Sequence, residues 1–117
     1  MAWNHREHDG VVILEMPVYL RSDEAFDRFI QTIGALMDAG KCRIILDFRH
    51  LALINSAGIA HLLRAAQDAR HKGGDVKVIR PKPAVRDLFR YTGMPAKIDI
   101  LSNETDAKKR FQRIACP

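Results

Sequence analysis

Residues 51–63 read LALINSAGIAHLL, and this stretch decides the fold. An apolar run up to Ile54 gives way to the small polar step Asn55-Ser56-Ala57-Gly58, and apolar residues then resume at helical spacing. Asn and Ser are preferred where helices begin, because their side-chain oxygens accept hydrogen bonds from the first backbone N–H groups. We therefore expect a helix to begin here, with Ser56 as a cap or a closely packed residue at its N-terminus. The aligned peptide dipoles favour an anion such as a phosphate at that position.

Strands and helices alternate on both sides of this step. Residues 43–48, RIILDF, have the nearly continuous apolar content of a strand buried on both faces of a parallel sheet. Asp9-Gly10 is typical of a hairpin turn between two N-terminal strands. The further expected elements are strands at 3–7, 11–16, 76–80 and 98–101, and helices at 23–39, 83–92 and from 104 onward.

This alternation predicts an α/β fold. Right-handed crossovers should build a mixed, mostly parallel β-sheet, with the N-terminal hairpin as an antiparallel edge and about four helices. A length of 117 residues without a linker, repeat or low-complexity segment suits a single domain spanning residues 1–117.

Several local signals define the helix ends and faces. Ser22 should cap the helix that follows it, with Asp23 and Glu24 as first-turn acids, and Asn103 should cap the last helix. Gly73-Gly74 should supply a left-handed stop. The buried face expected for the first helix comprises Phe26, Phe29, Ile30, Ile33 and Met37, and the last helix should bury Ala107, Phe111 and Ile114.

Composition excludes several classes of protein. No run approaches the roughly 20 apolar residues that cross a bilayer, and the polar N-terminus MAWNHREHDG lacks a secretory signal, so we expect a cytoplasmic protein without a membrane span. Cys42 and Cys116 are too few for a disulfide framework, which favours reduced thiols. Residues 64–90 hold eight Lys/Arg against three Asp, a basic stretch that could be a solvated surface or face an acidic partner.

Catalysis, metal binding and nucleic-acid binding find little support. Around Ser56 the hydrolase pattern Gly-x-Ser-x-Gly fails, because Ile54 stands at the first glycine position. His5-x-x-His8 lacks the further ligands of a metal site. No phosphate-binding loop or aromatic platform is present, so we expect no cofactor and no nucleic-acid partner; nucleotide binding by the chain remains open.

Three stretches resemble the STAS family, the domain of bacterial anti-sigma-factor antagonists and of the cytoplasmic tails of sulfate transporters. ILDF followed by LALINSAGIAHLL resembles the family's Asp-Ser-x-Gly motif with its Leu-rich helix. RHKGGDVKVI and RYTGMPAKIDIL follow in the family's order, and the resemblance covers about residues 9–111. It implies a STAS-like fold.

The resemblance also implies a function. Ser56 corresponds to the serine that a partner anti-sigma serine kinase phosphorylates using ATP; the unmodified antagonist binds that partner, the phosphorylated one releases it, and a phosphatase restores it. We expect the partner-binding residues to be Asn55, Ser56, Ala57, Gly58, His61 and Asp23, the last because it could lie near the Ser56 surface in the folded domain.

One departure from the family pattern concerns the residue before the serine. Asn55 replaces the family's Asp, which leaves the helix cap intact but removes a carboxylate beside Ser56. It favours an alternative role as a non-phosphorylated STAS subunit of a larger assembly, such as a membrane transporter complex. An enzymatic role would require turnover that depends on Ser56.

Overall fold

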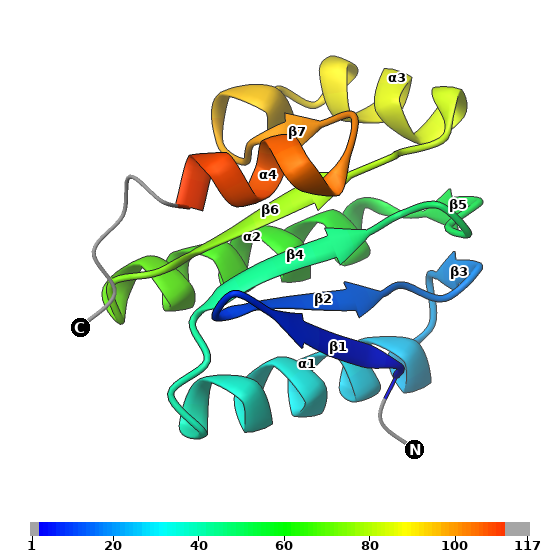
Figure 1. Ribbon diagram of the computed structural model, residues 1–117. Coiled ribbons are helices and arrows are strands. Elements are labelled where there is room, and N and C mark those ends of the chain that lie inside the picture. The colour runs from blue at the N-terminus through cyan, green and yellow to red at the C-terminus, as the bar shows by residue number, and fades with distance from the viewer. Residues whose placement is uncertain (1–2, 112–117) are drawn as a thin grey trace.

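The computed structural model describes residues 3–111 and consists of a five-stranded sheet with helices on both faces (Figure 1). The strands are β1 (His5–His8), β2 (Val11–Glu15), β3 (Tyr19–Leu20), β4 (Arg43–Asp47), β5 (Leu53–Ile54), β6 (Asp75–Ile79) and β7 (Ile100–Leu101). The helices are α1 (Asp23–Asp38), α2 (Ser56–His71), α3 (Pro83–Tyr91) and α4 (Glu104–Phe111), with a 3-10 turn at Met94–Ala96.

The large sheet has the strand order β1-β2-β4-β6-β7 and confirms the expected fold class. β1 pairs antiparallel with β2 through a turn in which Asp9 and Gly10 both have positive φ, 55° and 76°, as a tight hairpin requires. The other neighbours are parallel. All helices therefore begin near the carboxyl ends of the strands that precede them.

Successive residues of a strand point to opposite faces, and each face of the sheet buries its own cluster. The larger cluster joins Val12, Leu14, Ile44, Leu46, Val76 and Val78 to α1, α2 and α3. The smaller cluster joins Val11, Ile13, Ile45 and Ile79 to Ala107 and Phe111 of α4. In Figure 1, α4 accordingly lies on the opposite side of the sheet from α1 and α2.

The sequence patterns did not predict β3 and β5. These two-residue strands pair in parallel, Tyr19 with Leu53 and Leu20 with Ile54, and form a separate small sheet directly before α1 and α2 (Figure 1). Two residues are too short for periodicity to reveal. This β3–β5 sheet ties together the segments that lead into α1 and α2.

One expectation about packing was wrong. Ile30 is half exposed, because it lies at the edge of the α1 face that instead buries Thr32 and Leu36. The left-handed stop expected at Gly73-Gly74 is present at Gly73, with φ 86°. Gly74 is required for a different reason, since an added Cβ would lie 2.0 Å from the carbonyl oxygen of Cys42.

The N-caps predicted for α1 and α4 are confirmed. The Ser22 hydroxyl accepts from the Ala25 N–H, and Asn103 Oδ1 accepts from the Asp106 N–H at 2.9 Å. Cys42 is buried, whereas Ile114 and Cys116 lie outside the described residues. Among residues 3–111, the helices all fall short of the length and hydrophobicity that crossing a bilayer demands.

Candidate functional site

Asn55, and not Ser56, caps α2. Its backbone is extended, with φ −106° and ψ 179°, while Ser56 is the first helical residue. Asn55 Oδ1 accepts from the Gly58 N–H at 2.9 Å, and its amide nitrogen donates to the Arg21 carbonyl at 3.4 Å. One side chain thus caps α2 and links its start to the segment that enters α1, two residues before Asp23.

Gly58 positions this helix start against the small sheet. A Cβ at this residue would lie 2.7 Å from Ile54 Cγ1 and 2.8 Å from the Leu20 carbonyl oxygen. Real Cβ atoms do not approach that closely, so only glycine lets α2 pack on both short strands. Gly58 is itself buried, so its part in the site is to set the position of its exposed neighbours.

Ser56 and Ala57 are exposed at the first turn of α2. The first N–H groups of a helix have no intrahelical acceptor, and the helix dipole places partial positive charge there. The first turn of α2 contains no acidic residue that would already neutralise this charge. A phosphoryl group on the Ser56 hydroxyl would therefore stand at an end of a 16-residue helix that stabilises negative charge.

The remaining expected site residues lie on either side of this turn. Asp23 is exposed in the first turn of α1. His61 lies further along α2, partly buried, with its ring 4.7 Å from the ring of Phe26 on α1. The structure thus brings Asp23 to the same end of the molecule as Ser56, whereas His61 belongs to the contact between α1 and α2.

An exposed apolar patch, which we define as Val18, Tyr19 and Leu53, adjoins the helix start. Their exposed fractions are 46%, 50% and 47%, and the Val18 carbonyl accepts from the Leu53 N–H, so the three are neighbours. The Arg21 guanidinium lies 4.6 Å from the Tyr19 ring centroid. Sequence reasoning missed the patch; the available signal was a group of apolar residues flanking Pro17 with no strand long enough to bury them.

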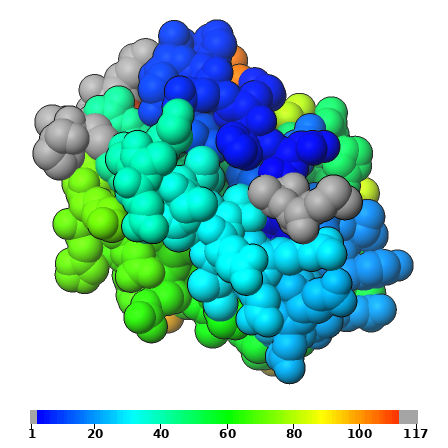
Figure 2. Space-filling view, turned by 90° about the horizontal axis from the view of Figure 1, so that it is seen from below, coloured from blue at the N-terminus to red at the C-terminus, as the bar shows by residue number. Residues whose placement is uncertain are grey.

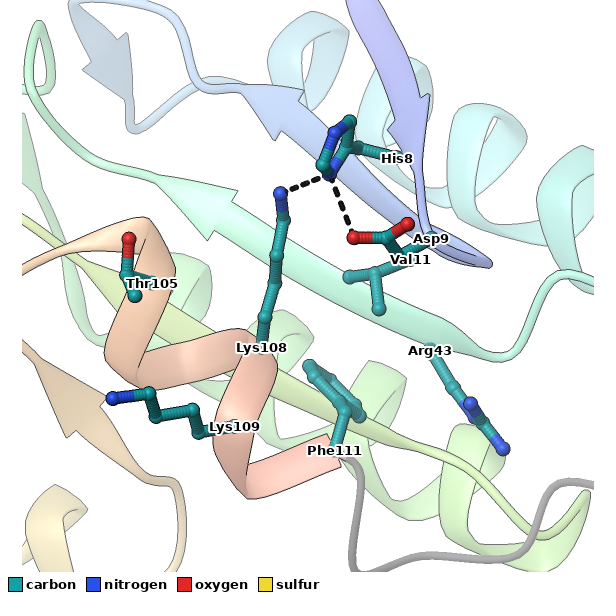
Figure 3. Close-up of a pocket in the computed structure, with 8 residues that line it drawn as sticks. All are labelled: His8, Asp9, Val11, Arg43, Thr105, Lys108, Lys109 and Phe111. Carbon is teal, nitrogen blue, oxygen red and sulfur yellow. Dashed lines mark hydrogen bonds and ion pairs between the residues drawn. The ribbon is translucent and has the colours of Figure 1, made fainter.

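A cavity lined by His8 lies on the face of the sheet that α4 covers (Figure 3). This cavity of about 310 Å³ lies between α4 and the β1–β2 turn. Lys108 points toward the His8 ring, whose Nδ1 also lies 3.1 Å from the Asp9 carboxylate. Within residues 3–111 no cluster of three metal-ligating side chains occurs, so His5 and His8 gain no further ligands there.

Ion pairs of α4 and the neighbouring strands lie beside this cavity. Glu104 pairs with Arg6 and Lys108. The hydrogen bond from Arg6, aided by Lys108, lowers the pKa of Glu104 to about 2. Lys77, buried in β6, contacts Asp75 and Asp99 at 3.1 and 2.8 Å, and its hydrogen bond lowers the pKa of Asp99. These carboxylates are held in salt bridges that join α4 to β1 and β6 to the residue before β7, which is a structural role.

Comparison with known proteins identifies relatives for this arrangement. The family model described as the STAS domain matches residues 2–107. A Bordetella bronchiseptica protein named "Putative anti-sigma factor antagonist BtrV" is 27% identical over 104 residues, which cover 89% of each chain.

Solved structures share the fold. TM1081 of Thermotoga maritima superposes with a TM-score of 0.85 at 20% identity, covering 95% of each chain. The anti-sigma factor antagonist SpoIIAA in its unphosphorylated form gives a TM-score of 0.78 at 21% identity over 97% of this chain and 99% of that one. The phosphorylated form of Bacillus SpoIIAA gives 0.69 at 20% identity over 93% and 98%. At these identities the likeness establishes the fold alone.

Proposed function

Because this chain belongs to the STAS domain family, we propose that it is an anti-sigma-factor antagonist that binds a partner serine kinase and is switched by phosphorylation at Ser56. The single observation that carries the proposal is the placement of an exposed serine as the first residue of α2, beside an exposed apolar patch. In this role the chain is a cytoplasmic regulatory binding protein, and ATP and the phosphoryl-transfer machinery come from the partner.

The apolar patch explains how an unmodified protein would hold a partner. Val18, Tyr19 and Leu53 are each about half exposed, so a partner surface placed over them removes apolar area from water. Tyrosine and arginine are among the residues most enriched at the positions that contribute most of the binding free energy of protein interfaces. Here the Arg21 guanidinium lies over the Tyr19 ring. Ser56 and Ala57 would form the polar border of this contact.

A phosphate at the edge of such a contact explains release. It adds about 1.5 to 2 negative charges and three strong acceptor oxygens. In the free protein water and the N-terminus of α2 solvate that charge. When a partner packs on the apolar patch the same charge loses its water, which costs binding free energy unless the partner supplies donors.

The experiment uses the kinase whose gene lies nearest to the gene for this chain. Incubation with that kinase and ATP should add one phosphate by intact mass, and Ser56→Ala should abolish the addition while keeping the complex. Ser102→Ala is the matched control, because Ser102 is also exposed but follows β7. Absence of an added phosphate with a kinase proven active on another substrate would refute the switch.

The residue before the serine supports a second candidate. Asn55 supplies no carboxylate beside the hydroxyl, so the chain could instead be a constitutive subunit of a transporter assembly that docks through the same end of α2. Copurification with a transporter ATPase, unaffected by Ser56→Glu, would establish that role. Loss of the complex in Ser56→Glu would favour the switch.

A further inference from the structure

An apolar groove of about 340 Å³ runs between α1 and α2. Phe29, Ile33 and Met37 of α1 and Ala65 of α2 lie at its base, and Ile30 and Gly34 of α1 border it. In Figure 2 the cyan surface of α1 crosses the face that contains this groove, and the green surface of α2 lies along its side. We call it the α1–α2 groove.

The packing of the chain itself does not explain why residue 34 is a glycine. It lies in the interior of the 16-residue helix α1, where glycine destabilises relative to alanine. A Cβ at this residue would meet nothing within 4 Å, so no neighbour excludes a side chain there. Gly58 and Gly74, by contrast, are required by backbone atoms at under 3.0 Å. The open space over Gly34 therefore suits an atom from outside the chain.

Ile30 provides the apolar contact next to that space. It precedes Gly34 by one turn and lines the same groove, and half of its surface is exposed. Residues four apart are neighbours on a helix surface, so Ile30 stands beside the gap that Gly34 leaves. An apolar side chain placed over Gly34 would bury Ile30.

The charge along this side of α1 indicates which kind of partner segment would present that apolar side chain. Asp23, Asp27, Ile30, Gly34 and Asp38 recur at spacings of four, three, four and four, which places them on one stripe. None of the three aspartates makes an ion pair with another residue in the part of the chain that the structure describes. On the α2 side Arg64 and Asp68 lie 3.5 Å apart and neutralise each other. The three aspartates do not line the groove itself, but they lie on α1 along the same stripe as Ile30 and Gly34, so the α1 surface beside the groove is negative.

We propose that the α1–α2 groove binds a basic amphipathic helix of a partner protein. Its apolar side would cover Ile30 and Gly34, and its lysines or arginines would face Asp23, Asp27 and Asp38. The stripe from Asp23 to Asp38 spans about 22 Å at 1.5 Å per residue, which matches a partner helix of about four turns. The negative charge of these aspartates favours a basic partner helix over an anionic membrane or a nucleic acid at this surface. The binding does not depend on phosphorylation of Ser56.

The test uses two synthetic helical peptides of 16 residues. Both present leucines at helical spacing on one side; the other sides carry lysines in the first peptide and glutamates in the second. Titration of the full ¹⁵N-labelled chain should show amide shifts confined to α1 and the facing side of α2, with the lysine peptide binding at least tenfold more tightly. Equal affinity of the two peptides, shifts elsewhere, or no binding of the lysine peptide at about 1 mM would overturn the proposal.

Paired variants connect the binding to the groove. Gly34→Leu fills the open space and should weaken the lysine peptide at least tenfold, whereas Gly34→Ala, the matched control, should change it less than threefold. Neutralising all three aspartates (Asp23→Asn, Asp27→Asn, Asp38→Asn) should weaken binding severalfold and flatten its salt dependence. Ser56→Glu should leave the peptide affinity unchanged, which separates this proposal from the phosphorylation switch. Full affinity in both the Gly34→Leu variant and the triple variant would refute it.

Discussion

Replacement of Asn55 separates its role as a helix cap from its lack of charge. Asn55→Ala removes the Oδ1 acceptor of the Gly58 N–H and the weaker bond to the Arg21 carbonyl. Loss of an N-cap costs about 1 kcal/mol, within a range of about 0.5 to 2. For a domain of this size that corresponds to a fall in Tm of about 4 °C. Urea unfolding monitored by circular dichroism measures the difference directly.

Asn55→Asp should behave differently. The carboxylate keeps the acceptor for Gly58 and gains about 0.3 to 1 kcal/mol from the N-terminus of α2, while it loses the 3.4 Å amide bond to Arg21. The two changes nearly offset, so we expect stability within about 0.5 kcal/mol of the wild type at pH 7. The Gly58 N–H and the helix dipole lower the pKa of the new carboxylate, so its contribution is complete above the unfolded value of about 3.9 and disappears as the pH falls through the lowered folded value.

Two outcomes of this comparison would refute the role of Asn55 as the cap of α2. If Asn55→Ala were as stable as the wild type, or Asn55→Asp as unstable as Asn55→Ala, the cap would not contribute as the geometry requires. Given matched stability, a faster phosphorylation of Ser56 in Asn55→Asp would show that the missing carboxylate limits transfer. An unchanged rate would show that the cap is all that this position supplies.

Three further substitutions test the packing and the ion pairs. Gly74→Ala should destabilise by about 3 kcal/mol in urea unfolding, because its Cβ would meet the Cys42 backbone, and an effect under about 1 kcal/mol would contradict the close approach. Gly34→Ala should stabilise by about 0.5 to 1 kcal/mol in the same assay, and a loss would contradict the open space. Glu104→Gln should cost at most about 1 kcal/mol at pH 7, because Arg6 is half exposed and solvent screens the pair. That cost should shrink as the pH falls from 4.5 toward about 2, and a constant difference would exclude the Arg6 pairing as its source.

The sequence predicted the large sheet well because its signals are local. The hairpin turn at Asp9-Gly10, the buried strand through Ile44 and the caps at Ser22 and Asn103 each follow from a few adjacent residues. Positions such as Ile30 depend on the angle between two helices, which no single segment determines. Its apolar character predicted burial, and the neighbouring helix leaves half of it exposed.

The candidate site was only partly predictable for the same reason. The start of α2 was correctly located, but the cap fell on Asn55, because either residue of the Asn-Ser pair can accept the bond and only the entering backbone angle decides. The apolar patch depends on β3 and β5, which pair across 34 residues of sequence. Two-residue strands leave no pattern in either segment alone.

The small β3–β5 sheet, which the sequence patterns did not predict, determines the position of Ser56. It holds Leu20 and Ile54 against Gly58, and the absence of a side chain at Gly58 brings the first turn of α2 down onto both. Tyr19 and Leu53 are the alternate residues of the same two strands, so pairing that buries Leu20 and Ile54 necessarily directs them outward beside Ser56. The exposed patch and the anion-favouring helix start are therefore two consequences of one structural unit. A substitution that breaks this pairing should impair partner binding and displace Ser56 together.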